Sequence, residues 1–558
     1  MDAADATARD TPDGATATGR PADLEHFAFS DDPPWIVEPE RLAWRGGLDE
    51  LRARTRAEVP ELTRPRRIPH APRVVRVVWR LGTAVGTWMA FDRRHGGSRS
   101  RQGISRRVRE AAEHLGPTYI KLGQIISSGR GLFPDELVDE FTKLRDQVPA
   151  EPFDVVRKVV EEELAQPLED VFSEFDPTPL AAASIAQVHR AVLRDGGVEV
   201  VVKVQRPTVY ELVHQDLKAM AWLAPFLIGR IPVAALANPP ALVELFAETI
   251  TEELDFRLEA GNMLDLARSF RELGQTGYVV PRPHARYVTR RIIVMERLSG
   301  FAFDDVAGIT DAGIDTEAII RTGMIGFMEG CMLHGIFHGD LHGGNLFVME
   351  DGRTALLDYG ITARMSPTER HAFLRLLVTA TMNDVRGQIA ALRDLGALPP
   401  DTDLDAVIRD LGLDQPPIDP TSMTPDELVT ELQRIVKAML AYGARMPKIL
   451  MLFVKNMLFL EAAIATLAPD LDLFGEITHI STHFATTHGP RIAQEIGMEP
   501  TEYELDLSGL KAGFGVEPTT STLTYRELQE RRNLIRSRLR QDDGPVDGPA
   551  DGPADERA

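Results

Sequence analysis

The sequence predicts an α+β fold with two lobes, a small β-rich lobe followed by a helical one. Residues 190–204 contain two β-rich runs around Asp195-Gly196-Gly197, a composition typical of a β-hairpin. Residues 366–490 follow mostly helical spacing. With 558 residues and 43% apolar content, the chain is globular in composition and too long for a single compact core.

Composition divides the chain into five segments. The first twenty residues and the terminal DGPVDGPADGPADERA lack hydrophobic periodicity, which predicts disorder. We predict a largely disordered tail at 1–62, a basic amphipathic segment and helical extension at 63–170, the β-rich N-lobe at 171–298, the helical C-lobe at 299–490, and a C-terminal extension with a disordered tail at 491–558.

Cysteine usage and the apolar runs favour a cytoplasmic protein. The single cysteine, Cys331, excludes an intrachain disulfide and fits a reducing compartment. The first twenty residues have neither the basic nor the apolar region of a secretory signal. Arg230 interrupts the apolar run 219–243, and Lys455 and Glu461 interrupt the run 449–467. We therefore expect both runs to be buried helices and predict no transmembrane helix.

The charge is unevenly distributed. A net charge of −22 argues against nucleic acid as a partner. Residues 64–109, however, contain thirteen arginines and one acid, a local charge of +12. Within them, residues 73–91 mix apolar and basic positions as an amphipathic helix does, with Trp79, Trp88 and Phe91. Two interpretations stay open: peripheral contact with an anionic membrane, or pairing of these arginines with the acidic remainder of the chain.

Three segments carry the residues that phosphoryl transfer needs, in the expected order. HGDLHGGN (338–345) fits the catalytic loop of protein kinases, in which Asp340 orients or deprotonates the nucleophile and Asn345 holds Mg²⁺. Asp358, in Asp-Tyr-Gly, stands thirteen residues later, where kinases carry a second magnesium ligand. Lys203 ends the β-rich run Val-Val-Val-Lys, as a phosphate-binding lysine requires. The sequence therefore predicts a protein-kinase-like fold that uses ATP and Mg²⁺.

Each segment alone has a simpler explanation, such as a solvated strand end or a common turn. His334, His338 and His342 also have the four-residue spacing of a helical metal site, but the four glycines among them disfavour such a helix. The conjunction of the three segments favours kinase-type phosphate chemistry over these explanations.

One part of a protein kinase is missing from the sequence. A Gly-x-Gly-x-x-Gly loop should precede Lys203. Residues 179–189, PLAAASIAQVH, stand there instead, and alanine lacks the backbone freedom of glycine. We therefore expect the nucleotide to be held differently. No Ala-Pro-Glu segment follows Asp358 either, which weakens the hypothesis of a protein substrate.

Over roughly residues 100–475 the sequence resembles the UbiB/AarF family of atypical kinases. The resemblance rests on LGPTYIKLGQ (115–124), AAAS (181–184), VVKVQRP (201–207), Glu253-Leu254-Asp255 with Glu259, HGDLHGGN (338–345) and LLDYG (356–360). The Lys-x-Gly-Gln segment and the alanine-rich loop are the specific parts of this pattern.

The resemblance implies roles for further residues. Glu259 would pair with Lys203, and both join Asp340 as catalytic residues. Glu253 and Asp255 would receive Lys121 and Gln124, which lie on an N-terminal helical extension that covers the peptide site of a protein kinase. Asn345 and Asp358 would hold the metal. ATP binding would involve Ala181, Ala182, Ala183, Ser184, Lys203 and Glu296.

The same resemblance implies an ATPase or restricted kinase that supports isoprenoid-quinone or other lipid metabolism, with a lipid or quinone-precursor ligand. The sequence departs from the family pattern at Gly339, at Gly343-Gly344 and at residues 127–134, and no C-terminal transmembrane pair follows. Two alternatives stay open: a small-molecule phosphotransferase of the aminoglycoside or choline kinase type, and a non-catalytic ATP-binding regulator. The sequence does not name the phosphate acceptor.

Overall fold

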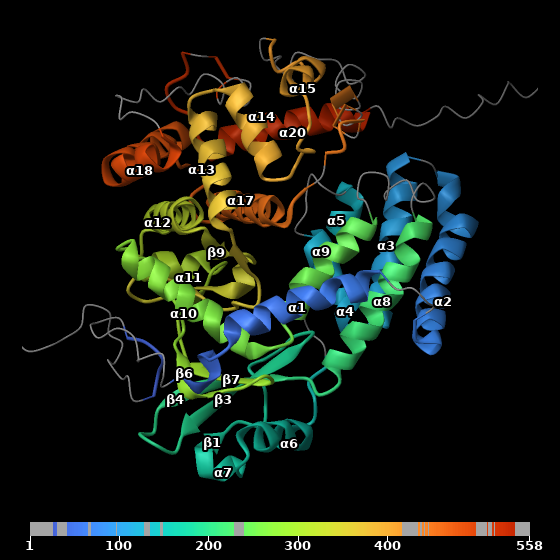
Figure 1. The fold of residues 1–558 in the computed structure, drawn as a ribbon, viewed down its shortest axis with the longest axis vertical. Coiled ribbons are helices and arrows are strands. Elements are labelled where there is room, and N and C mark those ends of the chain that lie inside the picture. Colours follow the sequence, from blue (N-terminus) through green and yellow to red (C-terminus); the bar gives the residue numbers. More distant parts are fainter. Residues whose placement is uncertain are drawn as a thin grey trace, which may run out of the picture.

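A computed structural model of the chain describes residues 26–30, 42–64, 69–95, 97–127, 134–144, 149–227, 239–415, 434–435, 438–439, 441–444, 446–497, 511, 516–517 and 519–541. The first twenty residues and the terminal DGPVDGPADGPADERA, which the sequence predicts to be disordered, lie outside these residues, and so does Arg230. The described part has the predicted α+β architecture, with a β-rich lobe, a helical lobe and a helical extension (Figure 1).

The extension is a group of helices beside the β-rich lobe. Its elements are η2 (Ala43–Arg45), α1 (Leu48–Thr63), α2 (Ala71–Thr87), the π-turn η3 (Trp88–Asp92), η4 (Arg93–His95), α3 (Gly97–Leu115), α4 (Pro117–Ser127) and α5 (Asp135–Phe141). They pack with α8 (Val209–Leu227) and α9 (Pro239–Glu252), as Figure 1 shows. The amphipathic helix predicted over 73–91 is confirmed as α2, which ends at Thr87 before the π-turn.

The predicted disordered tail at 1–62 is wrong in its last part. Residues 48–63 form α1, which packs against α8, α9 and α10, and residues 26–30 lie beside the β-sheet. The helix is rich in charged residues and buries only Leu48, Val59 and Leu62. Its stability therefore comes from tertiary packing, which a weak apolar pattern does not reveal.

The N-lobe contains an antiparallel sheet in the order β1-β3-β4-β7-β6, with β2 paired to β3. Its strands are β1 (Phe172–Phe175), β2 (Ala181–Ala182), β3 (Ala186–Leu193), β4 (Glu199–Gln205), β6 (Pro283–Val288) and β7 (Ile292–Glu296). The predicted hairpin is confirmed as β3–β4, and Gly196 and Gly197 take the positive φ values of 71° and 63° that its turn requires.

Alternation along β4 decides which side chains face the site. Val200, Val202 and Val204 are buried in a core with α6 (Phe153–Leu164) and α7 (Leu168–Val171). Successive side chains of a strand point to opposite faces. Lys203 therefore points away from this core, toward α10 (Phe256–Glu272), where its amine lies 5.3 Å from the ring centre of Phe256.

The catalytic segments lie on short strands that are separate from the N-lobe sheet. One sheet has the order β5-β11-β10-β8, and a separate pair joins β12 to β9. These strands are β5 (Tyr278–Val279), β8 (Phe301–Ala302), β9 (Ile336–His338), β10 (Leu346–Val348), β11 (Thr354–Leu356) and β12 (Thr362–Arg364). The predicted order of loop, strand, turn and strand over 338–360 is confirmed, with η7 (Gly343–Asn345) inside the loop.

The C-lobe is helical. It contains α11 (Val306–Asp311), α12 (Thr316–Glu329), the π-turn η6 (Gly330–His334), α13 (Pro367–Thr381), α14 (Val385–Asp394), α15 (Leu404–Leu411), α17 (Lys448–Leu467), α18 (Leu473–Ile496) and α20 (Tyr525–Gln541). The predicted boundary at residue 490 is wrong, because Pro490 lies inside α18. Beyond that helix, α20 packs on α17 and lies within the predicted C-terminal extension.

Among the described residues, α17 is the one helix whose length and hydropathy would suffice for a membrane span. In this fold its side chains Leu450, Leu452, Leu460 and Ile464 are buried in the main core, and Asn456 is fully buried. The helix thus packs within the C-lobe, as expected from the charges that interrupt it.

Candidate active site

A buried ion pair joins the N-lobe sheet to α10. Lys203 on β4 lies 2.7 Å from Glu259 on α10, and the Glu259 side chain is 3% exposed. Burial alone would lower the pKa of Lys203, but Asp358 and Glu259 outweigh it and raise that pKa. Burial raises the pKa of Glu259, against the charge of Lys203. The predicted pairing of Lys203 with Glu259 is therefore present.

His338 joins the catalytic loop to the Asp-Tyr-Gly segment. Its Nε2 donates a hydrogen bond to the carbonyl oxygen of Asp358, and its Nδ1 accepts one from the Asp340 N–H at 3.2 Å. Burial lowers the pKa of His338, which keeps the imidazole neutral and able to play both parts. A helical metal site of three histidines is thereby excluded, because His338 is at the end of β9 and His334 bonds Ser269.

Asp358 lies between a cation and a turn of its own backbone. The Gly360 N–H donates to its Oδ1 at 2.9 Å, and Lys203 lies 3.5 Å from its Oδ2. Desolvation would raise the pKa of Asp358, but Lys203 and Lys121 lower it to about 2. The side chain is 41% exposed, so this carboxylate is ionised at neutral pH and open to a ligand.

Asp340 and Asn345 are held by the short turn between them. The amide nitrogen of Asn345 donates to the carbonyl oxygen of Asp340 at 3.1 Å, which leaves the Asn345 carbonyl oxygen for a ligand. Burial would raise the pKa of Asp340, but Lys455 and then Lys121 hold it well below its ordinary value.

Two residues of α17 belong to the site although sequence reasoning missed them. Lys455 forms an ion pair with Oδ1 of Asp340. Its neighbour Asn456, fully buried, donates to the carbonyl oxygen of His338 and accepts from the Leu341 N–H at 3.1 Å. The sequence did contain a signal for these two residues. A Lys-Asn pair inside an apolar helix costs free energy unless both side chains find partners.

The extension reaches the site through Lys121 on α4. Its amine lies 3.2 Å from Glu253 and 3.9 Å from Oδ2 of Asp340. Burial alone would lower the pKa of Lys121, but Glu253, Asp340 and Asp358 raise it. Burial raises the pKa of Glu253 to about 7, against the charge of Lys121. Lys121 is thus a cation inside the catalytic centre.

The rest of the Lys-x-Gly-Gln and Glu-x-Asp pattern has local roles. A side chain at Gly123 would collide with Phe141 and Leu144, so glycine lets α4 lie close to α5. Asp255 caps α10 and binds Arg257 at 2.7 Å, whereas Glu253 of the same Glu-x-Asp pattern pairs with Lys121. Gln124 lies one turn after Lys121 and is half-buried.

The alanine-rich segment forms β2 and the turn into β3, next to Lys203 in the sheet. Val188 of β3 pairs with Ala181 on one side and with Lys203 on the other. Arg206 fixes this turn by donating to the carbonyl oxygen of Ala183 at 3.1 Å. Both carboxylate oxygens of Glu296 accept hydrogen bonds from Arg282. If Glu296 contacts ATP, it would therefore do so through its main-chain atoms.

The donor set suits Mg²⁺, which prefers carboxylate and carbonyl oxygens. Asp358 and Asn345 offer such oxygens at the mouth of the site. Oε1 of Glu253 is buried and has no hydrogen-bond partner among the described residues, which adds a third oxygen nearby. The residues present therefore fit the predicted ion.

Comparisons with known proteins match the chain to kinase-like proteins. The family model described as "ABC1 atypical kinase-like domain" matches residues 143–392. An uncharacterized protein of Mycobacterium tuberculosis is 34% identical over 457 residues, which cover 80% of this chain and 91% of that protein.

Two further relatives have names that refer to kinases. The probable protein kinase UbiB of Marinobacter nauticus is 33% identical over 376 residues, which cover 66% of this chain and 68% of that protein. The chloroplast protein ACTIVITY OF BC1 COMPLEX KINASE 1 of Arabidopsis thaliana is 30% identical over 429 residues, which cover 76% of this chain and 62% of that protein.

Proposed function

Because the chain belongs to the ABC1/UbiB family of atypical kinase-like proteins, we propose that it binds ATP with Mg²⁺ and acts as a restricted kinase or ATPase. The observation that carries this proposal is the convergence of Lys203, Asp358 and Asp340 on one site, with the lysine held by a buried glutamate. The acceptor of the phosphoryl group is a protein, a small molecule, a lipid or water.

Each charged residue has a separate task in this proposal. Lys203 binds the phosphates, and its pair with Glu259 fixes its position. Asp358 and Asn345 would hold Mg²⁺. When bound, this ion would neutralise the negative charge of the phosphates. The low pKa of Asp340 makes it a weak base, so its task is to orient the acceptor hydroxyl and take its proton late in the reaction.

The test of nucleotide binding is the variant Asp358→Asn. Adding ATP with Mg²⁺ should raise the Tm of the wild type, because a ligand that binds only the folded state stabilises it. Asp358→Asn removes a charged metal ligand and should abolish that magnesium-dependent shift, measured by thermal unfolding. Asp351→Asn, in the exposed turn between β10 and β11, is the matched control and should keep it. An undiminished shift in Asp358→Asn would refute the metal assignment.

The finer proposal, a role in isoprenoid-quinone or other lipid metabolism, is supported by an apolar cavity of about 270 Å³ between α17, α18 and α20. Phe453, Met457, Leu460 and Ile464 line it at helical spacing, whereas Lys455 projects from the other side of α17. A bound quinone-precursor-like phenol would thus lie behind the helix that holds Asp340. ATP turnover measured with and without such a phenol tests this link.

Peripheral membrane contact is supported by the exposed face of α2 and η3. Large apolar side chains there are unusually exposed: Trp79 by 69%, Val75 by 66% and Phe91 by 61%. Six of the arginines at 64–109 form ion pairs with acids, and one of the six, Arg73, is buried against Asp216. Five others are exposed and form no ion pair with any described residue: Arg76, Arg80, Arg93, Arg94 and Arg99. Exposed aromatic and basic groups together suit an anionic bilayer surface.

Binding to liposomes should therefore depend on anionic lipid and on salt. Each basic residue near an anionic surface contributes about 1 kcal/mol, and salt shortens the Debye length from roughly 10 Å at 0.1 M to about 3 Å at 1 M. Co-sedimentation should fall with salt and with Arg76→Glu/Arg80→Glu. The control Arg54→Glu/Arg386→Glu makes the same charge change at exposed arginines of α1 and α14 and should bind normally. Equal binding to neutral lipid would contradict the electrostatic account.

A further inference from the structure

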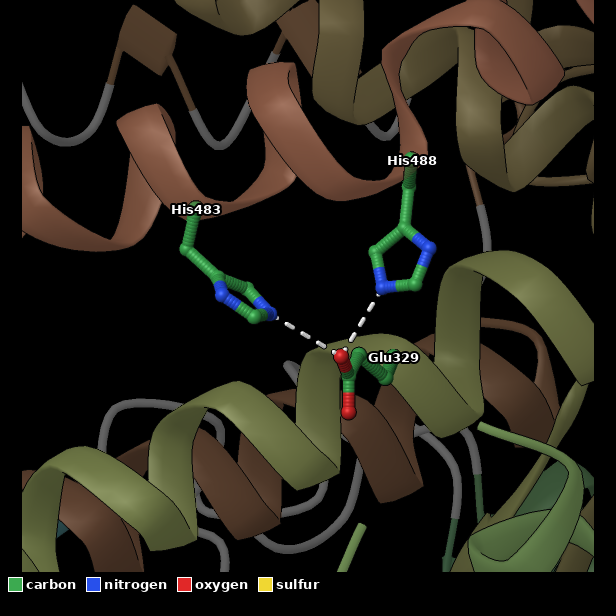
Figure 2. Close-up of side chains that lie close together, drawn as sticks. All are labelled: Glu329, His483 and His488. Atoms are coloured by element: carbon green, nitrogen blue, oxygen red, sulfur yellow. Dashed lines mark hydrogen bonds and ion pairs between the residues drawn. The ribbon is translucent and has the colours of Figure 1, made fainter. Parts of the chain in front are cut away.

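Three side chains of the C-lobe converge on one point away from the catalytic centre. Glu329 ends α12, while His483 and His488 lie on α18. The Nε2 atoms of the two histidines lie 3.1 Å and 2.9 Å from the same oxygen, Oε1 of Glu329. Figure 2 shows both rings pointing down from α18 onto this carboxylate. All three potential ligand atoms lie within 4.8 Å of one another.

The Glu329 carboxylate is buried without a strong cation. Its side chain is 4% exposed, and among the described residues neither a lysine nor an arginine forms an ion pair with it. Burying an ionised carboxylate costs several kcal/mol unless positive charge compensates it. Among the described residues, the groups on this carboxylate are the two imidazoles, so a compensating charge would come from them or from a bound cation.

We propose that Glu329, His483 and His488 form a binding site for a divalent transition-metal ion of the Zn²⁺ type. Two imidazole nitrogens and one carboxylate oxygen are ligands that Zn²⁺ accepts at about 2.0–2.2 Å in tetrahedral geometry. Such bonds place neighbouring ligand atoms about 3.3 Å apart. The observed separations of 3.1 Å and 2.9 Å from Oε1 of Glu329 are close to this value, and the ligand atoms of the two histidines lie within 4.8 Å of each other.

The fourth position of the ion would face solvent. His483 is 32% exposed, whereas His488 is 11% and Glu329 4% exposed. One side of the cluster is thus open to a water molecule or another ligand. The three residues lie on α12 and α18, whereas Asn345 and Asp358 lie on the loops beside β10 and β11, so the cluster is distinct from the proposed magnesium site.

The position of the cluster indicates what a metal would do there. Glu329 is followed by the π-turn η6 and by β9, which ends at His338 of the catalytic loop. A metal at Glu329 would fasten α18 to the segment that leads into this loop. It would take no direct part in chemistry at Asp340, because no residue of the catalytic centre is among its ligands.

The test is metal binding by untagged, chelator-treated full-length protein in excess Mg²⁺, which occupies the oxygen site. Zn²⁺ is titrated in competition with a coloured chelator, and Co²⁺ is added as a probe whose absorption reports tetrahedral coordination. One site per chain is expected, and bound Zn²⁺ should raise the Tm. Glu329→Gln keeps the side-chain shape and should lower the affinity more than about 100-fold, since even outer-shell partners cost 10- to 100-fold.

His479→Gln is the matched control, because His479 is exposed on the same helix one turn before His483. It should bind Zn²⁺ as the wild type does, whereas His488→Gln should not. If the histidine variants fail to fold, the Zn²⁺ affinity of Glu329→Gln is sufficient to test the proposal. Wild-type affinity in Glu329→Gln, or loss of binding in Asp358→Asn instead, would overturn the proposal. Absence of a tetrahedral Co²⁺ spectrum would show that the three residues only share hydrogen bonds.

Discussion

The variant Asp340→Asn is expected to lose ATP turnover by about 10²- to 10⁴-fold, the usual contribution of a positioned acid–base group. Asparagine keeps the shape of the side chain but cannot take a proton from the acceptor. Asp340 is not the proposed metal ligand, so binding of ATP with Mg²⁺ should stay close to that of the wild type. Phosphate release and the ATP-induced change in Tm, measured on the same preparation, separate these two effects.

Two outcomes would contradict the role given to Asp340. Turnover within about threefold of the wild type would show that this carboxylate does not act on the acceptor, because a positioned acid–base group contributes far more. Loss of the ATP-induced Tm shift together with turnover would show that Asp340 serves nucleotide binding instead. Asp351→Asn again serves as the control, since it makes the same change on the surface.

The sequence predicted those parts of the site that depend on short, ordered motifs. Lys203, Asp340, Asn345 and Asp358 lie together as expected, because each motif is a local backbone structure with one functional side chain. The hairpin at Gly196 was equally local, since its turn needs positive φ. Such features can be predicted from a few residues that are neighbours in the sequence.

The parts that sequence reasoning missed all depend on contacts between distant segments. Lys455 meets Asp340 across 115 residues, and His488 meets Glu329 across 159. Helix α1 has too weak an apolar pattern to be predicted and becomes stable only on α8, α9 and α10. In each case tertiary packing, absent from any local pattern, decided the outcome.

The second large effect is expected from Lys121→Met, which should raise turnover at least tenfold. Both oxygens of Asp340 face a lysine, Lys455 at Oδ1 and Lys121 at Oδ2, so an acceptor hydroxyl must compete with one of them. Charges about 4 Å apart near a protein surface interact by about 4 kcal/mol, and a tenfold change needs only about 1.4 kcal/mol of this. Methionine keeps the length of the side chain without the charge. A fall in turnover would show instead that Lys121 takes part in catalysis.

The same variant should lose stability in a pH-dependent way, through Glu253. The pKa of this buried carboxyl is about 7 beside Lys121, above its ordinary value, and should rise further without that cation. Between the ordinary and the raised pKa the folded state holds more protons than the unfolded state, so its stability falls as pH rises. At about pH 6 Glu253 is largely neutral and needs no partner. At about pH 8 the carboxyl of the variant must either stay protonated against the solvent pH or be charged without a partner, and both cost stability. The Tm deficit of Lys121→Met should therefore be larger at the higher pH, and Lys158→Met, on the exposed face of α6, should show none. A deficit independent of pH would mean that Lys121 stabilises the fold by packing rather than by neutralising Glu253.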